Sequence, residues 1–155
     1  MKNSNKMPKV FYLWALLSLI TAVLIFYFSS QNGQQSGNLS AGIVTKFLSE
    51  LVPSEYLIIA EGILRKLAHF SIYLLFGLCL YNSAYFYKDI RSISASCFVS
   101  LALAAVYAVS DEIHQLFVPG RTGALRDVLI DTAGAMCGIL VAGFFLTVSA
   151  KKHNK

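Results

Sequence analysis

Charged side chains are scarce in this sequence. Of its 155 residues, 14% are charged and 56% are hydrophobic, and the mean hydropathy is +0.61. Soluble domains usually carry about 25% charged residues, so the composition argues against a water-soluble globule. The chain also lacks the high charge of disordered proteins, the heptads of coiled coils and the Gly-X-Y period of collagen. What remains is a small integral membrane protein, with residues 1–155 forming a single domain.

Cysteine is scarce too. Cys79, Cys97 and Cys137 each fall inside an apolar run. An odd number of cysteines in such runs indicates small apolar side chains rather than disulfides or ligands. No H-E-x-x-H motif is present, and the combination of His69, His114 and Glu112 has no spacing that fixes a metal geometry. We therefore predict no metal and no cofactor.

Four apolar runs are long enough to cross a bilayer, which takes about 20 helical residues for about 30 Å of hydrocarbon. The first run could be a signal peptide, because lysines precede it. It is too long for a signal-peptide core, however, and no A-x-A cleavage pattern follows it, so we interpret it as a retained anchor. The predicted fold is all-α and polytopic, with spans at Val10–Phe28, Leu67–Phe86, Ile93–Val109 and Val128–Val148.

Two of these runs carry signals for close helix packing. Ile93–Val109 is rich in alanine and serine, and Gly134 and Gly138 form a G-x-x-x-G motif in the fourth run. Small residues let two helix backbones approach each other within a membrane.

The basic residues predict an orientation. With both termini in the cytoplasm, eight basic residues lie inside and five outside, a modest positive-inside bias. The net charge of +5 then reflects a basic inner fringe that attracts anionic lipid head groups, and no nucleic-acid partner is expected. The inner set is Lys2, Lys6, Lys9, Lys88, Arg91, Lys151, Lys152 and Lys155, and the outer set is Lys46, Arg65, Lys66, Arg121 and Arg126.

An amphipathic helix is predicted between the first two spans. Its apolar face recurs at helical spacing and ends before Pro53, and Lys46 lies away from it. The helix either lies in the outer membrane interface or packs across the bundle as a lid, and the pattern fits both. One or two further turns, Ser54–Leu64, are expected to lead into the second span with Ser54 as their cap. The apolar face consists of Leu39, Ile43, Val44, Phe47, Leu48 and Leu51.

Ionisable residues gather at three helix ends, which share the outer level of an up-and-down bundle. Asp127, Asp131, Gly134 and Gly138 fall at i, i+4, i+7 and i+11, so the two acids share the face of the glycines. Phe117–Arg121 should stop the third helix, because proline lacks an N–H and glycine tolerates a positive φ. The gathered residues are Arg65, Lys66, His69, Asp111, Glu112, His114, Gln115, Arg121, Arg126, Asp127 and Asp131.

Charges at this depth need partners. An ion at mid-bilayer costs roughly 2.5–3.5 kcal/mol on insertion scales, so the cluster requires pairing, solvation or a bound charge. One reading is a purely structural network, with Lys66 or Arg65 paired to Asp131 and Arg121 paired to Glu112, which would fix the helix register. The other reading is a binding site.

The same residues carry a resemblance to the VanZ-like family of bacterial membrane proteins. It extends from about Tyr12 to Leu146. The family pattern more often has asparagine at the position of Asp131, so this chain departs from it by an added acid. The matching stretches are Ser29–Ser30–Gln31, Arg65–Phe70, Ser110–Gln115 and Pro119–Gly120–Arg121, followed by Asp127, Asp131, Gly134 and Gly138.

The resemblance implies a bacterial plasma-membrane protein that acts at the cell envelope and is linked to teicoplanin tolerance. Our first hypothesis is that the outer cleft binds an anionic lipid, a lipid-linked cell-wall precursor or the acylated glycopeptide itself. Arginine suits bidentate contacts to phosphate or carboxylate, and lysine acts as a point charge. The predicted binding set is Arg65, Lys66, His69, Asp111, Glu112, Gln115, Arg121, Asp127 and Asp131.

The alternative is an intramembrane enzyme that modifies a lipid-linked envelope substrate. Glu112 or Asp127 would serve as general base and His69 as acid or base. No nucleophile motif such as G-x-S-x-G supports this reading. Transport is a third possibility, but four spans without paired broken helices leave little room for a pathway in a monomer.

Overall fold

The computed structural model describes residues 7–48, 53–87, 89–90 and 92–153. Several residues used in the sequence argument lie outside these ranges: Lys2, Lys6, Leu51, Lys88, Arg91 and Lys155.

The described chain is all-helical and contains five helices in the order α1 (Lys9–Ser29), α2 (Gly33–Leu48), α3 (Ser54–Phe86), α4 (Ile93–Gln115) and α5 (Leu125–His153). Among the described residues, four helices are long and apolar enough to cross a membrane: α1, α3 from Tyr56, α4, and α5 up to Ser149. The predicted architecture of four spans and one additional helix is therefore confirmed.

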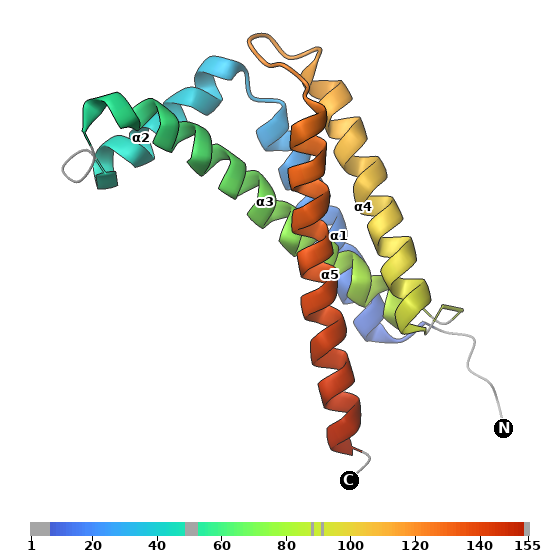
Figure 1. The fold of residues 1–155 in the computed structure, drawn as a ribbon. Coiled ribbons are helices and arrows are strands. Elements are labelled where there is room, and N and C mark those ends of the chain that lie inside the picture. Colours follow the sequence, from blue (N-terminus) through green and yellow to red (C-terminus); the bar gives the residue numbers. More distant parts are fainter. Residues whose placement is uncertain (1–6, 49–52, 88, 91, 154–155) are drawn as a thin grey trace, which may run out of the picture.

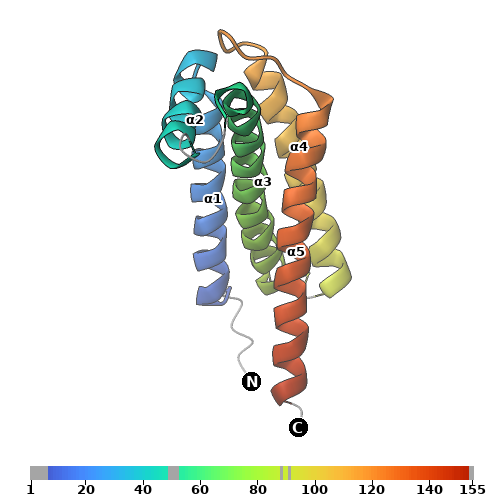
Figure 2. The ribbon, with the colours of Figure 1, turned by 60° about the vertical axis from the view of Figure 1, so that its left-hand side comes forward.

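The four long helices run up and down as a bundle (Figures 1 and 2). The start of α1 and the end of α5 lie at the same end of it. At the opposite end, the turn after α1 and the loop between α4 and α5 lie beside each other, and the Gly33 N–H donates to the Pro119 carbonyl at 3.1 Å. We call this opposite end the polar end.

Helix α3 is longer than a bilayer requires. Its 33 residues extend about 50 Å at 1.5 Å per residue, against about 30 Å of hydrocarbon. Its first turns lean away from the bundle together with α2 (Figure 1). The structure merges the expected Ser54–Leu64 turns and the second span into one helix, in which Pro53 occupies the N-cap position. The prediction that Ser54 is the cap is wrong, because Ser54 is already the first helical residue.

Helix α2 begins six residues before the predicted apolar stretch and packs along α3 rather than across the end of the bundle (Figure 2). Its buried side is narrow and consists of Ser40 and Val44. Leu39, Ile43 and Phe47 remain about half exposed or more. This placement argues against the lid, and it leaves part of the apolar face of α2 exposed, as a helix at a membrane interface requires.

Small side chains hold the spans together. On α4, Ser96, Ser100, Ala104 and Ala108 recur every four residues and are buried. Between α3 and α5 the contact is closer still, because a Cβ added at Gly134 or Gly138 would overlap α3 backbone at Phe70 or Leu74. Gly77 of α3 faces Ala135 of α5 in the same way. The predicted role of Gly134 and Gly138 in backbone approach is confirmed.

Candidate functional site

The predicted charged residues converge on one cavity at the polar end. It has a volume of about 180 Å³ and is enclosed by α3, the end of α4, the following loop and the start of α5. Eight of the nine predicted binding residues line it, and the ninth, Asp111, lies directly beside it, with a carboxylate oxygen within 4.8 Å of His69 and Asp131 ligand atoms. We call it the polar cavity; its lining is Gly62, Arg65, Lys66, His69, Glu112, Gln115, Gly120, Arg121, Thr122, Asp127, Ile130 and Asp131.

The ion pairs at this cavity differ from the predicted ones. Lys66 Nζ contacts Asp127 Oδ1 at 2.5 Å, and His69 Nδ1 lies 3.6 Å from Asp131 Oδ1. The predicted pairing of Lys66 or Arg65 with Asp131 is wrong. Helices α3 and α5 both start at the polar end and run in the same direction, so residues at matching depth face each other. Lys66 therefore meets Asp127, and His69, about one turn deeper, meets Asp131.

Glu112 and Arg121 do not pair with each other either. The Ala124 N–H donates to Glu112 Oε2 at 2.8 Å, just before α5 begins, so this carboxylate caps a helix start. Arg121 donates from Nε to the Gln31 carbonyl at 3.0 Å and from Nη2 to the Phe28 carbonyl at 3.1 Å. The predicted pairing is wrong because both groups find backbone partners at helix ends.

Arg121 fastens the loop to the end of α1. The last carbonyls of a helix have no partner within it, and a guanidinium beside them satisfies both their hydrogen bonding and the helix dipole. Gly120 has a φ of 73°, which places Arg121 next to the turn after α1 and confirms the predicted glycine turn. Burial lowers the pKa of Arg121 from its usual range, and the nearby charge of Arg65 lowers it further.

Arg65 has no counter-ion among the described residues. Among the described residues nothing forms a hydrogen bond or ion pair with it, and its Nε is buried without a partner. It lies close enough to Arg121 for the two positive charges to interact. An arginine pair of this kind attracts an anion.

An apolar groove adjoins the polar cavity. It has a volume of about 340 Å³ and lies among α1, α2 and α3. Arg65, His69 and Arg121 line both the groove and the cavity. The groove is otherwise lined mainly by aliphatic and aromatic side chains, with a few polar ones: Ile25, Phe28, Gln31, Ser36, Leu39, Ser40, Ile43, Leu64, Ala68 and Ile72.

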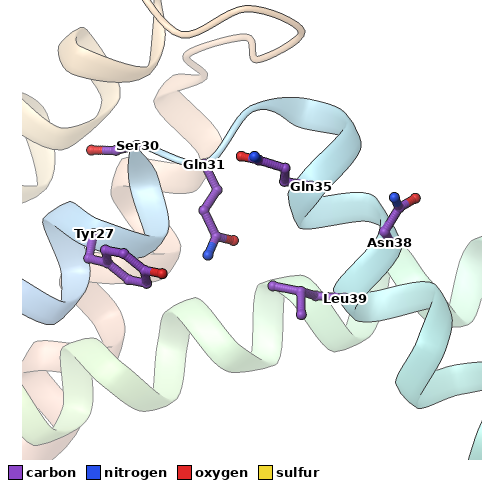
Figure 3. Close-up of a pocket in the computed structure, with 6 residues that line it drawn as sticks. All are labelled: Tyr27, Ser30, Gln31, Gln35, Asn38 and Leu39. Atoms are coloured by element: carbon purple, nitrogen blue, oxygen red, sulfur yellow. The ribbon is translucent and has the colours of Figure 1, made fainter.

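A third, shallower pocket lies where α1 passes into α2 (Figure 3). Its volume is about 620 Å³, and it is lined by Tyr27, Ser30, Gln31, Gln35, Asn38 and Leu39. No charged side chain lines it, so amide and hydroxyl groups alone supply its polarity. It is less suited to an anion than the polar cavity.

Two of the gathered polar residues, His114 and Arg126, lie outside the polar cavity, whereas Gln115 lies where predicted. His114 Nε2 lies 3.2 Å from Ser30 Oγ, and its ring packs on Phe26, so it does not join His69 and Glu112. Arg126 is exposed and lines none of these three pockets. Gln115 donates from Nε2 to Asp111 Oδ2 at 3.3 Å, as their shared helix face predicts.

Sequence reasoning assigned no role to several groups of the site. Ser29 and Tyr73 each bury a hydroxyl without a hydrogen-bond partner, and the carbonyls of Phe28 and Gln31 hold Arg121. Tyr73 follows His69 by one helical turn, and this spacing places it on the same face. Backbone carbonyls leave no signal in a sequence.

Comparison with known proteins identifies the family. A family model described as VanZ/LLP1 matches residues 11–146. No curated protein and no solved structure matches the chain. The chain belongs to the VanZ/LLP1 family, as its motifs predict.

Proposed function

We propose that this VanZ/LLP1 protein binds an anionic lipid or a lipid-linked head group at the polar end of its bundle. The observation that carries the proposal is the position of Arg65 and Arg121 at the junction of the polar cavity and the apolar groove. A molecule with a charged head and a hydrocarbon chain matches both compartments at once.

The charges at the junction support an anionic head. Lys66 is already neutralised by Asp127, whereas Arg65 has no partner among the described residues. Arg121 uses Nε and Nη2 on carbonyl groups and keeps its positive charge. A phosphate or carboxylate between the two guanidinium groups would offset their mutual repulsion and receive charge-assisted hydrogen bonds.

The apolar groove is suited to the hydrocarbon chain of such a lipid. Ile25 of α1, Ile43 of α2 and Ile72 of α3 line it, so a hydrocarbon would contact three helices. The exposed apolar side chains of α2 favour placing this helix at the membrane surface, where a lipid can enter sideways.

The biological setting we propose is the bacterial plasma membrane, with both termini cytoplasmic and the polar end outside. Teicoplanin, an acylated glycopeptide, and lipid-linked cell-wall precursors both combine a polar head with a chain in the outer leaflet. Binding of either class at this site would link the protein to teicoplanin tolerance.

A binding measurement with Arg65→Gln tests the proposal. Purified protein in detergent is titrated with a fluorescent polyprenyl phosphate, and a zwitterionic phosphatidylcholine analogue serves as control lipid. A charge-assisted hydrogen bond contributes about 1.5–3 kcal/mol, so its loss should lower the affinity for the phosphate lipid by about tenfold or more. Arg65 is the better probe than Arg121, because replacing Arg121 also releases the loop.

Arg126→Gln is the matched control, since this exposed arginine lies outside the cavity and the groove. It should bind the phosphate lipid as the unaltered protein does. Equal affinity of Arg65→Gln and the unaltered protein would refute the proposal. In a susceptible host, Arg65→Gln should also abolish any teicoplanin tolerance that the unaltered protein confers. Chemical conversion of the bound lipid by the purified protein would instead support the enzymatic alternative.

A further inference from the structure

Three potential metal ligands meet beneath the arginine pair, one from each of three helices. His69 of α3, Asp111 of α4 and Asp131 of α5 offer ligand atoms that all lie within 4.8 Å of one another. Asp111 is 5% exposed and Asp131 is fully buried. Among the described residues, this is the one group of three or more histidine, cysteine or acidic side chains close enough together to hold a metal ion.

The carboxylate of Asp131 is fully buried, and the imidazole of His69 is the nearest basic group that the structure places beside it. Neither of its oxygens accepts a hydrogen bond, and His69 Nδ1 at 3.6 Å is beyond hydrogen-bond distance. Lys66 contacts Asp127 and makes no ion pair with Asp131. An isolated buried carboxylate costs several kcal/mol unless it is paired or coordinates a cation. The hydroxyl of Tyr73 is also buried without a hydrogen-bond partner.

We propose that His69, Asp111 and Asp131 bind a divalent cation, with Zn²⁺ as the best fit. Zn²⁺ takes imidazole nitrogen and carboxylate oxygen at about 2.0–2.2 Å, so neighbouring ligands in a tetrahedron lie about 3.3–3.5 Å apart. The distance of 3.6 Å between His69 and Asp131 is already close to this value. Mg²⁺ fits less well, because it prefers oxygen ligands and retains several waters.

The site has an open coordination position. His69 and Asp131 both line the polar cavity, so a fourth ligand can reach the ion from there. Three protein ligands with one open position are typical of catalytic rather than structural zinc. The cation would also neutralise two carboxylates that otherwise lie close together, and it would add an attraction for an anionic head group in the cavity.

This inference does not require the proposed lipid binding. It uses neither Arg65 nor Arg121, so either site can exist without the other. Arg65→Gln should therefore lose affinity for the phosphate lipid and keep affinity for zinc.

A zinc titration of the full-length protein tests the inference. The protein is purified in detergent without a histidine tag, stripped with a chelator and titrated with Zn²⁺ against a chromophoric competitor. We expect one equivalent to bind and the thermal midpoint to rise. Asp131→Asn removes a ligand while keeping its shape, and should weaken the affinity by at least about tenfold and abolish the thermal shift.

Asp89→Asn is the matched control, since it alters an exposed acid between α3 and α4, at the end of the bundle opposite the polar cavity. It should bind zinc like the unaltered protein. If Asp131→Asn does not fold, Asp111→Asn and His69→Gln replace it, with the same expected loss. Retained affinity in these variants, or failure of the folded, unaltered protein to bind one equivalent of either Zn²⁺ or Mn²⁺, would overturn the inference.

Discussion

The contact between α3 and α5 has two levels of opposite character. Deeper in the bundle, Gly134 and Gly138 bring the two backbones so close that a Cβ would not fit. Toward the polar end, the same two helices face each other through Lys66 and Asp127 and enclose a cavity. Two helices that touch at one level and cross there must diverge at another, as α3 and α5 do in Figure 1.

The difference shows how a small bundle accommodates a polar site. Without a hydrophobic driving force between helices in lipid, close packing of small residues supplies the association. The glycines fix the point where α3 and α5 cross; we call this contact the glycine level. Toward the polar end the two helices separate, and the space between them holds side chains that a continuous close contact would exclude. Stability and binding thus rest on different turns of the same pair of helices.

The largest expected effect comes from breaking the glycine level. Gly138→Ala would place a Cβ against the carbonyl of Leu74, and the two helices must separate to accept it. Overpacking of this kind costs about 1–3 kcal/mol, and more where backbone is the obstacle. We expect a destabilisation of about 2–3 kcal/mol, measured by unfolding in SDS, together with weaker binding at the polar cavity.

Gly42→Ala provides the comparison, because nothing lies within 4 Å of a Cβ at that position of α2. Alanine in a helix interior is favoured over glycine by about 0.5–1 kcal/mol, so this variant should be neutral or slightly stabilised. Equal stability of the two variants would show that the glycine level does not hold α3 against α5.

The two levels also differ in how far the sequence alone predicts them. The spans follow from runs of uncharged residues, and the approach at Gly134 and Gly138 follows from their spacing, since both depend on local composition. The prediction stops the third span at Val109, whereas α4 continues to Gln115. Asp111, Glu112 and Gln115 are helical and buried, and a run defined by missing charge cannot include them.

Which side chains pair at the polar end depends on how deep each helix sits in the bundle and how it is rotated about its axis. The sequence of one helix does not determine either. The sequence brings the correct residues to one end, but the structural-network reading pairs Lys66 or Arg65 with Asp131, whereas Lys66 contacts Asp127. The same reading pairs Arg121 with Glu112, yet Arg121 donates to the Gln31 and Phe28 carbonyls, which are accessible because α1 ends at Ser29. Predicting these contacts requires the relative placement of four helices.

A smaller effect is expected from loosening the rim of the cavity. Arg121→Lys keeps the charge but cannot reach the Gln31 and Phe28 carbonyls from two nitrogens at once. Hydrogen bonds of charged groups contribute about 1.5–3 kcal/mol, and solvent at this half-buried site should reduce the loss to about 1–2 kcal/mol. The turn after α1 should then exchange its amide hydrogens faster, including the Gly33 N–H that donates to Pro119.

Hydrogen exchange followed by mass spectrometry measures this directly on the segment between α1 and α2. Arg126→Lys, at an exposed position, should leave exchange there unchanged. Unchanged exchange in Arg121→Lys as well would mean that the loop holds its position without the guanidinium.

The smallest effect concerns the ion pair itself, and it decides which level holds the helices together. Lys66 and Asp127 are 41% and 37% exposed, so water screens their attraction and the pair should contribute less than about 1 kcal/mol. A double-mutant cycle of Lys66→Met, Asp127→Asn and both together isolates the coupling from the other effects of each change. We expect the coupling energy of the pair to be smaller than the loss of unfolding free energy in Gly138→Ala, because water does not screen the close packing of two backbones. A coupling above about 2 kcal/mol would reverse the assignment, since the polar level would then stabilise the bundle as well as form its site.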